Sequence, residues 1–223
     1  MTLTAIFRGK QHLEPPPWLY ARMARSGWFR RVYQRLAADL GAYLPRGARV
    51  LDVGTGPGYL LHYLARDRPD LDLWGLDFAY GMIRRGRRRQ EGSPVQGRRQ
   101  WVVADALALP FPAATFQHVL TTFSFHIWPQ PVQGLKEMLR VLQTGSQAWI
   151  YELQREAGKG EIRAFAREEA LPFPLVYLGC KTASRHHAVP MADFTNLLTQ
   201  AAGSQWRLTP AHHLFWRAEL TRA

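Results

Sequence analysis

The residues best suited to do chemistry lie in one short segment. From Val50 to Leu60 the chain reads Val-Leu-Asp-Val-Gly-Thr-Gly-Pro-Gly-Tyr-Leu, with an acid two places before the first of three alternate glycines. The apolar start predicts a buried strand, the glycines a turn, and the end the start of a helix. Glycine lets a ligand approach the main chain closely, and the helix points free N–H groups into the turn. The segment predicts a pocket for a carboxylate or phosphate; a helix-capping loop that binds nothing is the alternative.

The spacing of the glycines separates two classes of ligand. A dinucleotide fingerprint, Gly-x-Gly-x-x-Gly, would need a glycine at position 59, where Tyr59 stands. The third glycine is Gly58 instead, and Asp52 lies beside the turn. A carboxylate at this position would repel a pyrophosphate but suits an ammonium group. The pattern therefore favours a ligand with an ammonium group over a dinucleotide.

Two later strands are also followed by an acid. Residues 71–76 read as a second strand, and Asp77 comes about 20 residues after the glycine turn, where a carboxylate can accept hydrogen bonds from both ribose hydroxyls. Residues 100–104 read as a third strand, and Asp105 follows it. Each aspartate alone is best explained as a helix N-cap or turn residue. Three acids at the ends of successive strands favour a shared binding site.

These segments resemble a known family. The glycine segment is similar to motif I of the class I S-adenosylmethionine (SAM) methyltransferases. Asp105–Pro112, Phe116–Pro131 and Lys136–Gly145 resemble the adenine-side loop, the fourth strand with its loop, and the helix before strand five of the ubiquinone/menaquinone-biosynthesis-like (type 11) group. The resemblance extends from Arg46 to Leu153. It implies a SAM-dependent methyltransferase whose product is S-adenosylhomocysteine (SAH).

The resemblance also implies which residues bind the cofactor. The ligand of this family has an amino-acid tail with both charges, and the acid in the place of Asp105 takes the adenine amino group. Phe78 follows the second strand and is expected to lie against the adenine. The predicted cofactor-binding residues are Asp52, Gly54, Thr55, Gly56, Gly58, Asp77, Phe78, Met82, Asp105, Ala106 and Thr122.

Methyl transfer from a sulfonium is an in-line displacement, so the enzyme mainly aligns the acceptor with the methyl group and excludes water. A base is needed only when the acceptor keeps its proton at neutral pH. His126 stands on the loop that faces the methyl group in this family, and a histidine suits proton removal from a phenol or an enol. We therefore predict His126 as the catalytic residue; its alternative role is to shape the loop or to bind a lid carbonyl. Gln117 replaces the usual acid of strand four and is given no role.

Alternating strands and helices must position these residues. The fold class predicted is α/β, a Rossmann-like seven-stranded, mostly parallel sheet with helices on both faces and an antiparallel last strand. The expected strands cover residues 48–53, 71–76, 100–104, 116–123, 147–152, 206–210 and 214–220. The expected helices of this core cover residues 57–65, 79–89, 131–142 and 191–202.

Two segments lie outside this alternation within a single methyltransferase domain over residues 1–223. Residues 1–45 are predicted to form an N-terminal helical cap, and residues 154–190 an insert or lid. Ligands in this fold bind beyond the carboxyl ends of the strands, so both segments can reach the site. Their aromatic content favours a flat or hydrophobic acceptor, although a small second core is an equal alternative. The predicted substrate contacts are Trp18, Tyr20, Tyr177 and His187.

Composition limits the class of protein further. No run of 18 apolar residues occurs in the 223 residues, so no membrane span is expected. The first residues lack the apolar region of a secretory signal, and the single cysteine, Cys180, fits a reducing compartment, so we expect a cytoplasmic protein. The histidine pairs at 186–187 and 212–213 would point to opposite sides of a strand and lack zinc-site motifs, so we expect no metal.

The net charge of +12 leaves two alternatives to a small-molecule methyltransferase. Seven arginines and one glutamate between residues 84 and 99 contribute half of that charge. A solvated helix face explains them best, but a nucleic-acid substrate is the runner-up. The Asn-Pro-Pro-Tyr or Asp-Pro-Pro-Tyr loop of base methylation is missing, since Thr122–Phe125 reads Thr-Phe-Ser-Phe. A non-catalytic SAM-binding module is the third hypothesis, because fold does not fix activity.

Overall fold

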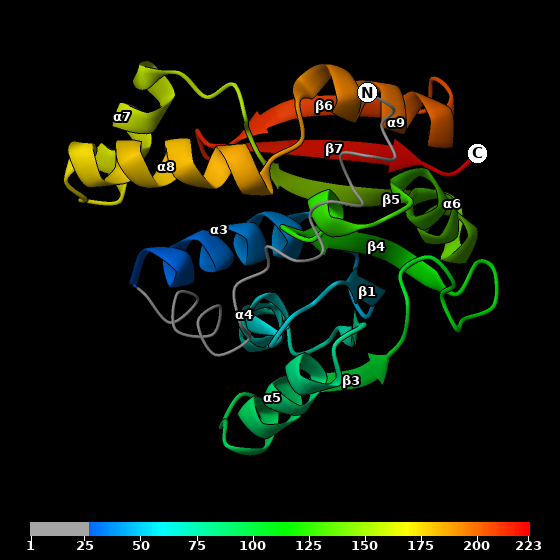
Figure 1. Ribbon diagram of the computed structural model, residues 1–223. Helices are drawn as coiled ribbons and strands as arrows, with labels where there is room; N and C mark the ends of the chain where they lie inside the picture. Colours follow the sequence, from blue (N-terminus) through cyan, green and yellow to red (C-terminus); the bar gives the residue numbers. More distant parts are fainter. Residues whose placement is uncertain (1–26) are drawn as a thin grey trace.

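The computed structural model describes residues 27–223 and contains one seven-stranded sheet in the order β3-β2-β1-β4-β5-β7-β6 (Figure 1). Strands β1 to β5 pair in parallel, and β7 pairs antiparallel with both β5 and β6. The predicted fold class is therefore confirmed. The strands are β1 (Arg49–Val53), β2 (Asp72–Asp77), β3 (Arg98–Val103), β4 (Phe116–Thr122), β5 (Leu142–Leu153), β6 (Trp206–Ala211) and β7 (Phe215–Thr221).

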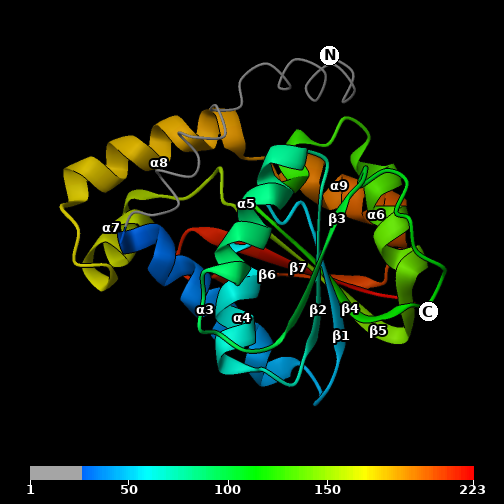
Figure 2. The ribbon, with the colours of Figure 1, turned by 90° about the horizontal axis from the view of Figure 1, so that it is seen from below.

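Helices cover both faces of the sheet. Figures 1 and 2 show α3, α4 and α5 on one face, and α6 and α9 on the other. The core is correspondingly divided into two clusters of buried side chains, one on each face. The described helices are α3 (Gly27–Tyr43), α4 (Tyr59–Asp67), α5 (Tyr80–Glu91), α6 (Pro131–Val141), α7 (Lys159–Glu168), α8 (Phe173–His187), α9 (Met191–Ala202) and the 3-10 helix η1 (Phe125–Ile127).

The central strands are buried on both faces. Val50, Leu51 and Val53 of β1 and Val119 and Leu120 of β4 are fully buried. Parallel strands sandwiched between helices lose the alternation of polar and apolar residues, which is why these segments read as continuous apolar runs.

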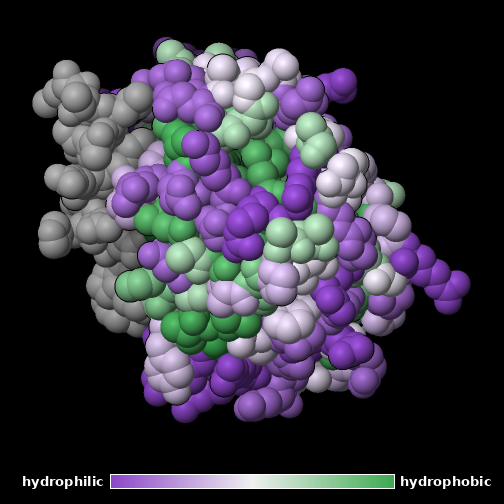
Figure 3. Space-filling view, turned by 90° about the vertical axis from the view of Figure 1, so that its right-hand side faces the viewer, coloured by the Kyte–Doolittle hydropathy of each residue, from purple (hydrophilic) through white to green (hydrophobic). Residues whose placement is uncertain are grey.

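The molecular surface on the side of α6 and α9 is mixed in character. Figure 3 shows hydrophilic and hydrophobic residues interspersed there.

Prolines lie at the start of two helical segments. The apolar segment at 171–178 contains two prolines, yet it lies mostly in α8. Pro172 is the N-cap of that helix and Pro174 lies in its first turn, where a missing N–H costs nothing. Pro57 was expected in the first turn of its helix, but α4 begins at Tyr59 after the N-cap Gly58.

The sequence analysis assumed that the histidine pairs lie on strands, but the structure places them elsewhere. His187 ends α8, while His212 and His213 form the turn between β6 and β7 with φ values of +45° and +64°. His212 lies 2.9 Å from Asp39 of α3, and His213 lies 3.1 Å from Glu168 of α7. The two turn histidines therefore tie the hairpin to two different helices.

Trp18 and Tyr20 and most of the predicted N-terminal cap lie outside the described residues. Among the side chains that the structure describes, no group of three or more His, Cys, Asp or Glu residues is placed to hold a metal ion. Of the helices described, none combines the length and apolar character that a membrane crossing requires.

Candidate functional site

The glycine turn after β1 needs its glycines for backbone conformation. Gly54, Gly56 and Gly58 have φ values of +74°, +55° and +70°, in the left-handed region that other residues rarely adopt. The N–H groups of Gly54 and Thr55 donate to the carbonyl of Leu76 at 2.8 and 2.9 Å, which ties the turn to the end of β2. The turn is thus a fixed corner at the carboxyl edge of the sheet.

Two of these glycines also make room for neighbouring side chains. A Cβ on Gly54 would lie 2.6 Å from the Cβ of Ser124, in the loop after β4. A Cβ on Gly58 would lie 2.6 Å from Cζ3 of the Trp101 indole on β3. Gly54 therefore allows the β4 loop to reach the corner. Gly58, which the sequence analysis assigned to ligand binding, also accommodates Trp101.

Asp52 lies buried beneath this corner with half of its carboxyl group unused. Its Oδ2 accepts a hydrogen bond of 2.7 Å from the hydroxyl of Thr55, whereas Oδ1 finds no partner in the described part of the chain. Burial, supported by the charge of Asp77 and opposed by the Thr55 bond, raises the pKa of Asp52 to about 7. A buried acceptor without a partner is costly, so this oxygen is suited to a donor that arrives with a ligand.

Asp77 at the end of β2 is held between the glycine turn and the start of α5. Its Oδ2 accepts the N–H of Gly56 at 2.9 Å, and its Oδ1 accepts the N–H of Ala79 at 2.8 Å. Burial raises the pKa of Asp77 above its ordinary value, although these two bonds oppose the shift. Each oxygen keeps a second lone pair, so the carboxylate can still accept two hydroxyl donors.

The other predicted cofactor residues line the same edge. Phe78 is 78% exposed, and Asp105 is exposed and accepts the N–H of Leu107 at 2.9 Å, as a turn residue does. The sheet order puts the ends of β3, β2, β1 and β4 side by side, with the crossover direction changing between β1 and β4. Ligands of open α/β sheets bind at such a switch point. Met82 and Ala106 are half-buried, and Thr122 is buried at the end of β4.

His126 lies in η1, directly after β4, and is buried against a carboxylate from the neighbouring strand. Glu152 of β5 is 2% exposed, and its Oε2 lies 3.1 Å from Nδ1 of the His126 ring. The other oxygen accepts the backbone N–H of His126 at 3.3 Å. The sequence analysis missed Glu152. Its signal was a lone acid directly after the apolar run at 148–151, near the carboxyl end of a strand.

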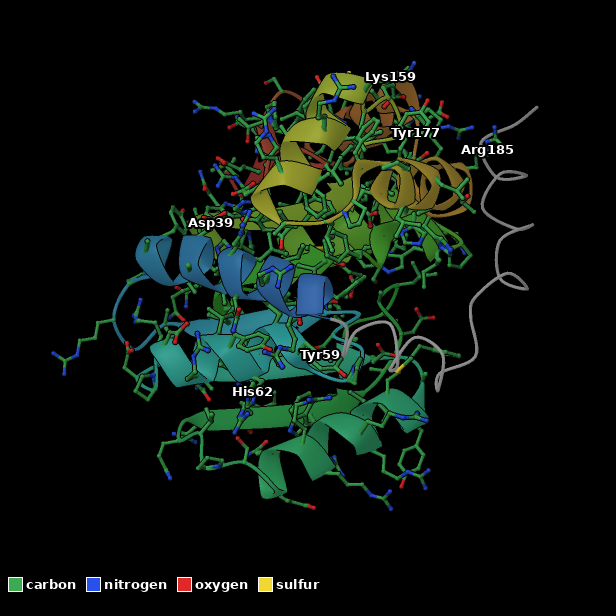
Figure 4. All side chains as sticks on the ribbon, turned by 90° about the vertical axis from the view of Figure 1, so that its left-hand side faces the viewer. Asp39, Tyr59, His62, Lys159, Tyr177 and Arg185 are labelled. Carbon is green, nitrogen blue, oxygen red and sulfur yellow. The ribbon has the colours of Figure 1, made fainter. Side chains whose placement is uncertain are left out.

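The insert brings one of its two predicted substrate residues to this place. The ring of His187, at the C-terminal end of α8, lies 5.4 Å from the ring of His126 at an interplanar angle of 77°. Tyr177 lies about 15 Å earlier along the helix axis and packs against Phe173 with a centroid distance of 5.6 Å. Figure 4 shows Tyr177 in α8 on one side of α3 and Tyr59 in α4 on the other. The structure therefore joins His187 to His126 but keeps Tyr177 apart.

Aromatic rings surround the loop between β4 and His126. Phe123 has a positive φ of +55°, and its ring lies 6.4 Å from Phe29, 6.1 Å from Tyr33 and 4.9 Å from Phe215. These rings come from α3, from the loop and from β7, so they gather three distant parts of the chain. They form an apolar, aromatic cluster around Phe123, three residues before His126 in the chain.

The arginine-rich segment at 84–99 lies in α5, in β3 and in the loop between them. The guanidinium of Arg89 lies 3.9 Å from the ring centroid of Tyr59, and its Nε donates to the carbonyl of Pro57, so it braces the start of α4. None of the ion pairs found between described residues involves the seven arginines at 84–99. Arg84, Arg87, Arg88 and Arg98 are exposed and form a basic surface without carboxylate partners among the described residues, whereas Arg99 is buried.

Comparison with known sequences agrees with this geometry. Residues 50–145 match a family model described as a methyltransferase domain. The chain is 43% identical over 107 residues to the ubiquinone/menaquinone biosynthesis C-methyltransferase UbiE of Geobacter sulfurreducens, covering 48% of this chain and 42% of that protein. It is 36% identical over 120 residues to the demethylmenaquinone methyltransferase of Thermus thermophilus, covering 54% of this chain and 53% of that protein. The aligned regions thus span about half the length of these curated relatives.

Comparison with solved structures gives the same fold. A putative S-adenosyl-L-methionine-dependent methyltransferase from Methanococcus maripaludis superposes with a TM-score of 0.71 over 93% of this chain and 92% of its own, at 18% identity. A SAM-dependent methyltransferase from Aquifex aeolicus gives a TM-score of 0.69 over 94% of this chain and 100% of its own, at 16% identity. At these identities the likeness shows the shared fold.

Proposed function

We propose, from the match of residues 50–145 to a methyltransferase-domain family model, that this chain transfers a methyl group from SAM to a small aromatic or hydrophobic acceptor. The observation that carries the proposal is the buried Asp52, whose Oδ1 lacks a partner in the described chain beside three left-handed glycines. A ligand with an ammonium group and a carboxylate fits both features. The amine would meet Asp52, and the carboxylate would meet free N–H groups at the start of α4.

The remaining parts of SAM have matching groups along the edge. Asp77 offers a fixed carboxylate to the two ribose hydroxyls, and the exposed ring of Phe78 offers a flat surface to the adenine. Asp105 follows β3 on the same side and would accept the adenine amino group. When bound, SAM supplies a methyl group on a positively charged sulfur, which is an electrophile with a good leaving group.

The chain's own work is then to hold the acceptor and to exclude water. We assign the acceptor side to the loop after β4, where His126 is the proposed base and the aromatic cluster around Phe123 is the proposed apolar wall. Residues 154–190, with α7 and α8, are the proposed lid, because His187 at the end of α8 reaches His126.

The aromatic cluster around Phe123 favours a flat acceptor. One relative is named a ubiquinone/menaquinone biosynthesis C-methyltransferase and another a demethylmenaquinone methyltransferase. A reduced naphthoquinone ring with a free position is therefore the first acceptor to test. Phenols and other small hydroxyaromatic compounds follow in the same panel.

Calorimetric titration with SAM and SAH tests the cofactor assignment. We expect micromolar affinity in the full chain and a loss of at least about tenfold, or about 1.4 kcal/mol, in Asp77→Ala. Asp67→Ala is the matched control, because Asp67 pairs with Arg66 at the far end of α4 and should leave the affinity unchanged. Folded protein that gives no heat with either nucleotide would overturn the proposal.

A further inference from the structure

Glu152 is a buried acidic residue whose described side-chain contacts all involve one residue. Both of its oxygens interact with His126, one with the ring nitrogen Nδ1 and one with the backbone N–H. Among residues 27–223, no lysine or arginine forms an ion pair with it. A buried carboxylate without a cationic partner is expensive for stability. A glutamine or an apolar side chain would cost less here, so the carboxylate calls for a functional explanation.

The contact determines which nitrogen of His126 carries the proton. An ionised carboxylate only accepts hydrogen bonds, so the ring nitrogen beside Glu152 must be the donor. The neutral ring is then protonated at Nδ1 and has its lone pair at Nε2. This is the form in which a histidine can take a proton at Nε2, and the carboxylate then stabilises the imidazolium that results.

Three parts of the fold meet at His126 and limit from which side an acceptor can reach it. Glu152 approaches from β5, and His187 approaches from the end of α8. Ser124, two residues earlier in the same loop, lies against Gly54 of the glycine turn. His126 is therefore enclosed between the predicted cofactor corner and the insert, where an acceptor must enter.

We propose that Glu152 is a positioning residue that holds His126 as the Nδ1–H tautomer, and that the acceptor class is one that must lose a proton during methylation. This proposal rests on the proposed methyl transfer. The acceptor's O–H bond breaks and its proton goes to Nε2 of His126. The electron pair left on the oxygen, or delocalised onto a ring carbon of the resulting enolate, forms the bond to the methyl carbon. The carbon–sulfur bond breaks with its pair left on sulfur, so the positive charge passes from the sulfonium to the imidazolium.

The tautomer is tested directly by nitrogen NMR of the full chain labelled at histidine, at about pH 8.5, where ordinary histidines are neutral. The His126 signals are identified by their loss in His126→Gln. We expect a protonated Nδ1 in the wild type, a mixture of tautomers in Glu152→Gln, and recovery of the Nδ1–H form in Glu152→Asp. Glu91→Gln makes the same chemical change at an exposed residue and should change nothing. A wild-type ring protonated at Nε2, or a tautomer unaffected by Glu152→Gln, would overturn the proposal.

Kinetics separate a positioning role from a merely structural one. With 1,4-dihydroxynaphthalene, which keeps its protons at neutral pH, Glu152→Gln should lower kcat by about tenfold to a hundredfold and leave KM for SAM unchanged. With 4-nitrocatechol, which is largely ionised near neutral pH, the same variant should keep kcat within about twofold. An equal loss on both acceptors would show that Glu152 acts through structure alone. SAM titration keeps the two proposals distinct: a Glu152→Gln protein that binds SAM normally but keeps the wild-type tautomer contradicts only the positioning role.

Discussion

Gly58 and Trp101 occupy adjoining space: a Cβ on the glycine would stand 2.6 Å from Cζ3 of the indole. The same indole lies 2.5 Å from the position of a Cβ on Gly86 of α5, and its Nε1 donates to Gln90 at 2.7 Å. The predicted cofactor turn is thus packed directly onto the helix and strand that follow it. A glycine that looks like part of a binding motif is also a packing residue.

Gly58→Ala should therefore destabilise the chain more than its backbone strain alone explains. Gly145→Ala is the matched control, because Gly145 has a similar φ of +76° but open space within 4 Å of the place where its Cβ would stand. Left-handed strain costs each variant about 1–2 kcal/mol, and the clash adds about 1–3 kcal/mol to Gly58→Ala alone. Urea unfolding measures the difference. Equal losses, or a Gly58→Ala loss that is just as large in a Trp101→Ala background, would contradict the packing argument.

Asp52 should make the cofactor-free chain less stable as the pH rises. Its pKa is about 7 in the folded chain, against an ordinary value of 3.8, so the folded state keeps a proton that the unfolded state releases. Stability is then lost between about pH 4 and pH 7, by up to about 4 kcal/mol. Asp52→Asn removes that dependence and should be more stable than the wild type at pH 8, while its affinity for SAM falls. Unfolding midpoints from pH 5 to pH 8, with Asp67→Asn as control, check this; an Asp52→Asn chain that is less stable at pH 8 would contradict it.

His118 should have the opposite effect. Its ring is fully buried on β4 between Tyr43 and Trp149, at centroid distances of 5.5 and 5.1 Å, and neither nitrogen has a partner among the described residues. Burial lowers its pKa from 6.5 to about 3. The unfolded chain therefore takes up a proton that the folded chain refuses, and stability is lost as the pH falls from about 6.5 towards 3.

Two substitutions separate the causes of that acid sensitivity. His118→Gln removes the titration but keeps a buried polar group, whereas His118→Leu removes both. Both variants should lose the acid dependence relative to the wild type, and only His118→Leu should gain stability at pH 8, by about 1–3 kcal/mol. A wild-type dependence retained in His118→Gln would show that another group is responsible.

The arginines of α5 should bind polyanions weakly. Arg84, Arg87 and Arg88 are exposed, so replacing all three with Gln should lower the salt needed to elute the chain from heparin. Any RNA complex should be lost by about 0.2 M salt, because such contacts depend on counterion release. The control is a second triple variant with the same loss of charge. It replaces Arg46, Arg155 and Arg207, which are exposed but far apart in the sequence, with Gln. An equal shift in both variants would show a mere effect of net charge, and an RNA complex that survives physiological salt would favour a nucleic-acid substrate.

Local patterns in the sequence were enough to predict most of the framework. The periodicity of apolar residues predicts a helix over 191–202, and α9 has these bounds. The alternate glycines after Asp52 predict a turn, and all three have positive φ. These features depend on neighbours within a few positions, which one sequence displays directly.

Features that depend on distant neighbours were not predictable in the same way. Glu152 meets His126 across 26 residues, because β5 lies beside β4 in parallel, and no local pattern gives that register. Trp101 meets Gly58 only through the packing of β3 against α4 and α5. Pro172 and Pro174 look like breaks in a scan of the chain, although they lie at the start of α8.

The near contact of Gly54 with Ser124 couples the glycine turn to the loop after β4. Ser124 also accepts the indole N–H of Trp128 at 3.0 Å, so displacing it would shift the anchor on the far side of His126 as well. A methyl group added at residue 54 would thus shift the surroundings of His126 without touching it. A substitution at residue 54 is therefore constrained by the loop that carries His126 as well as by the turn itself.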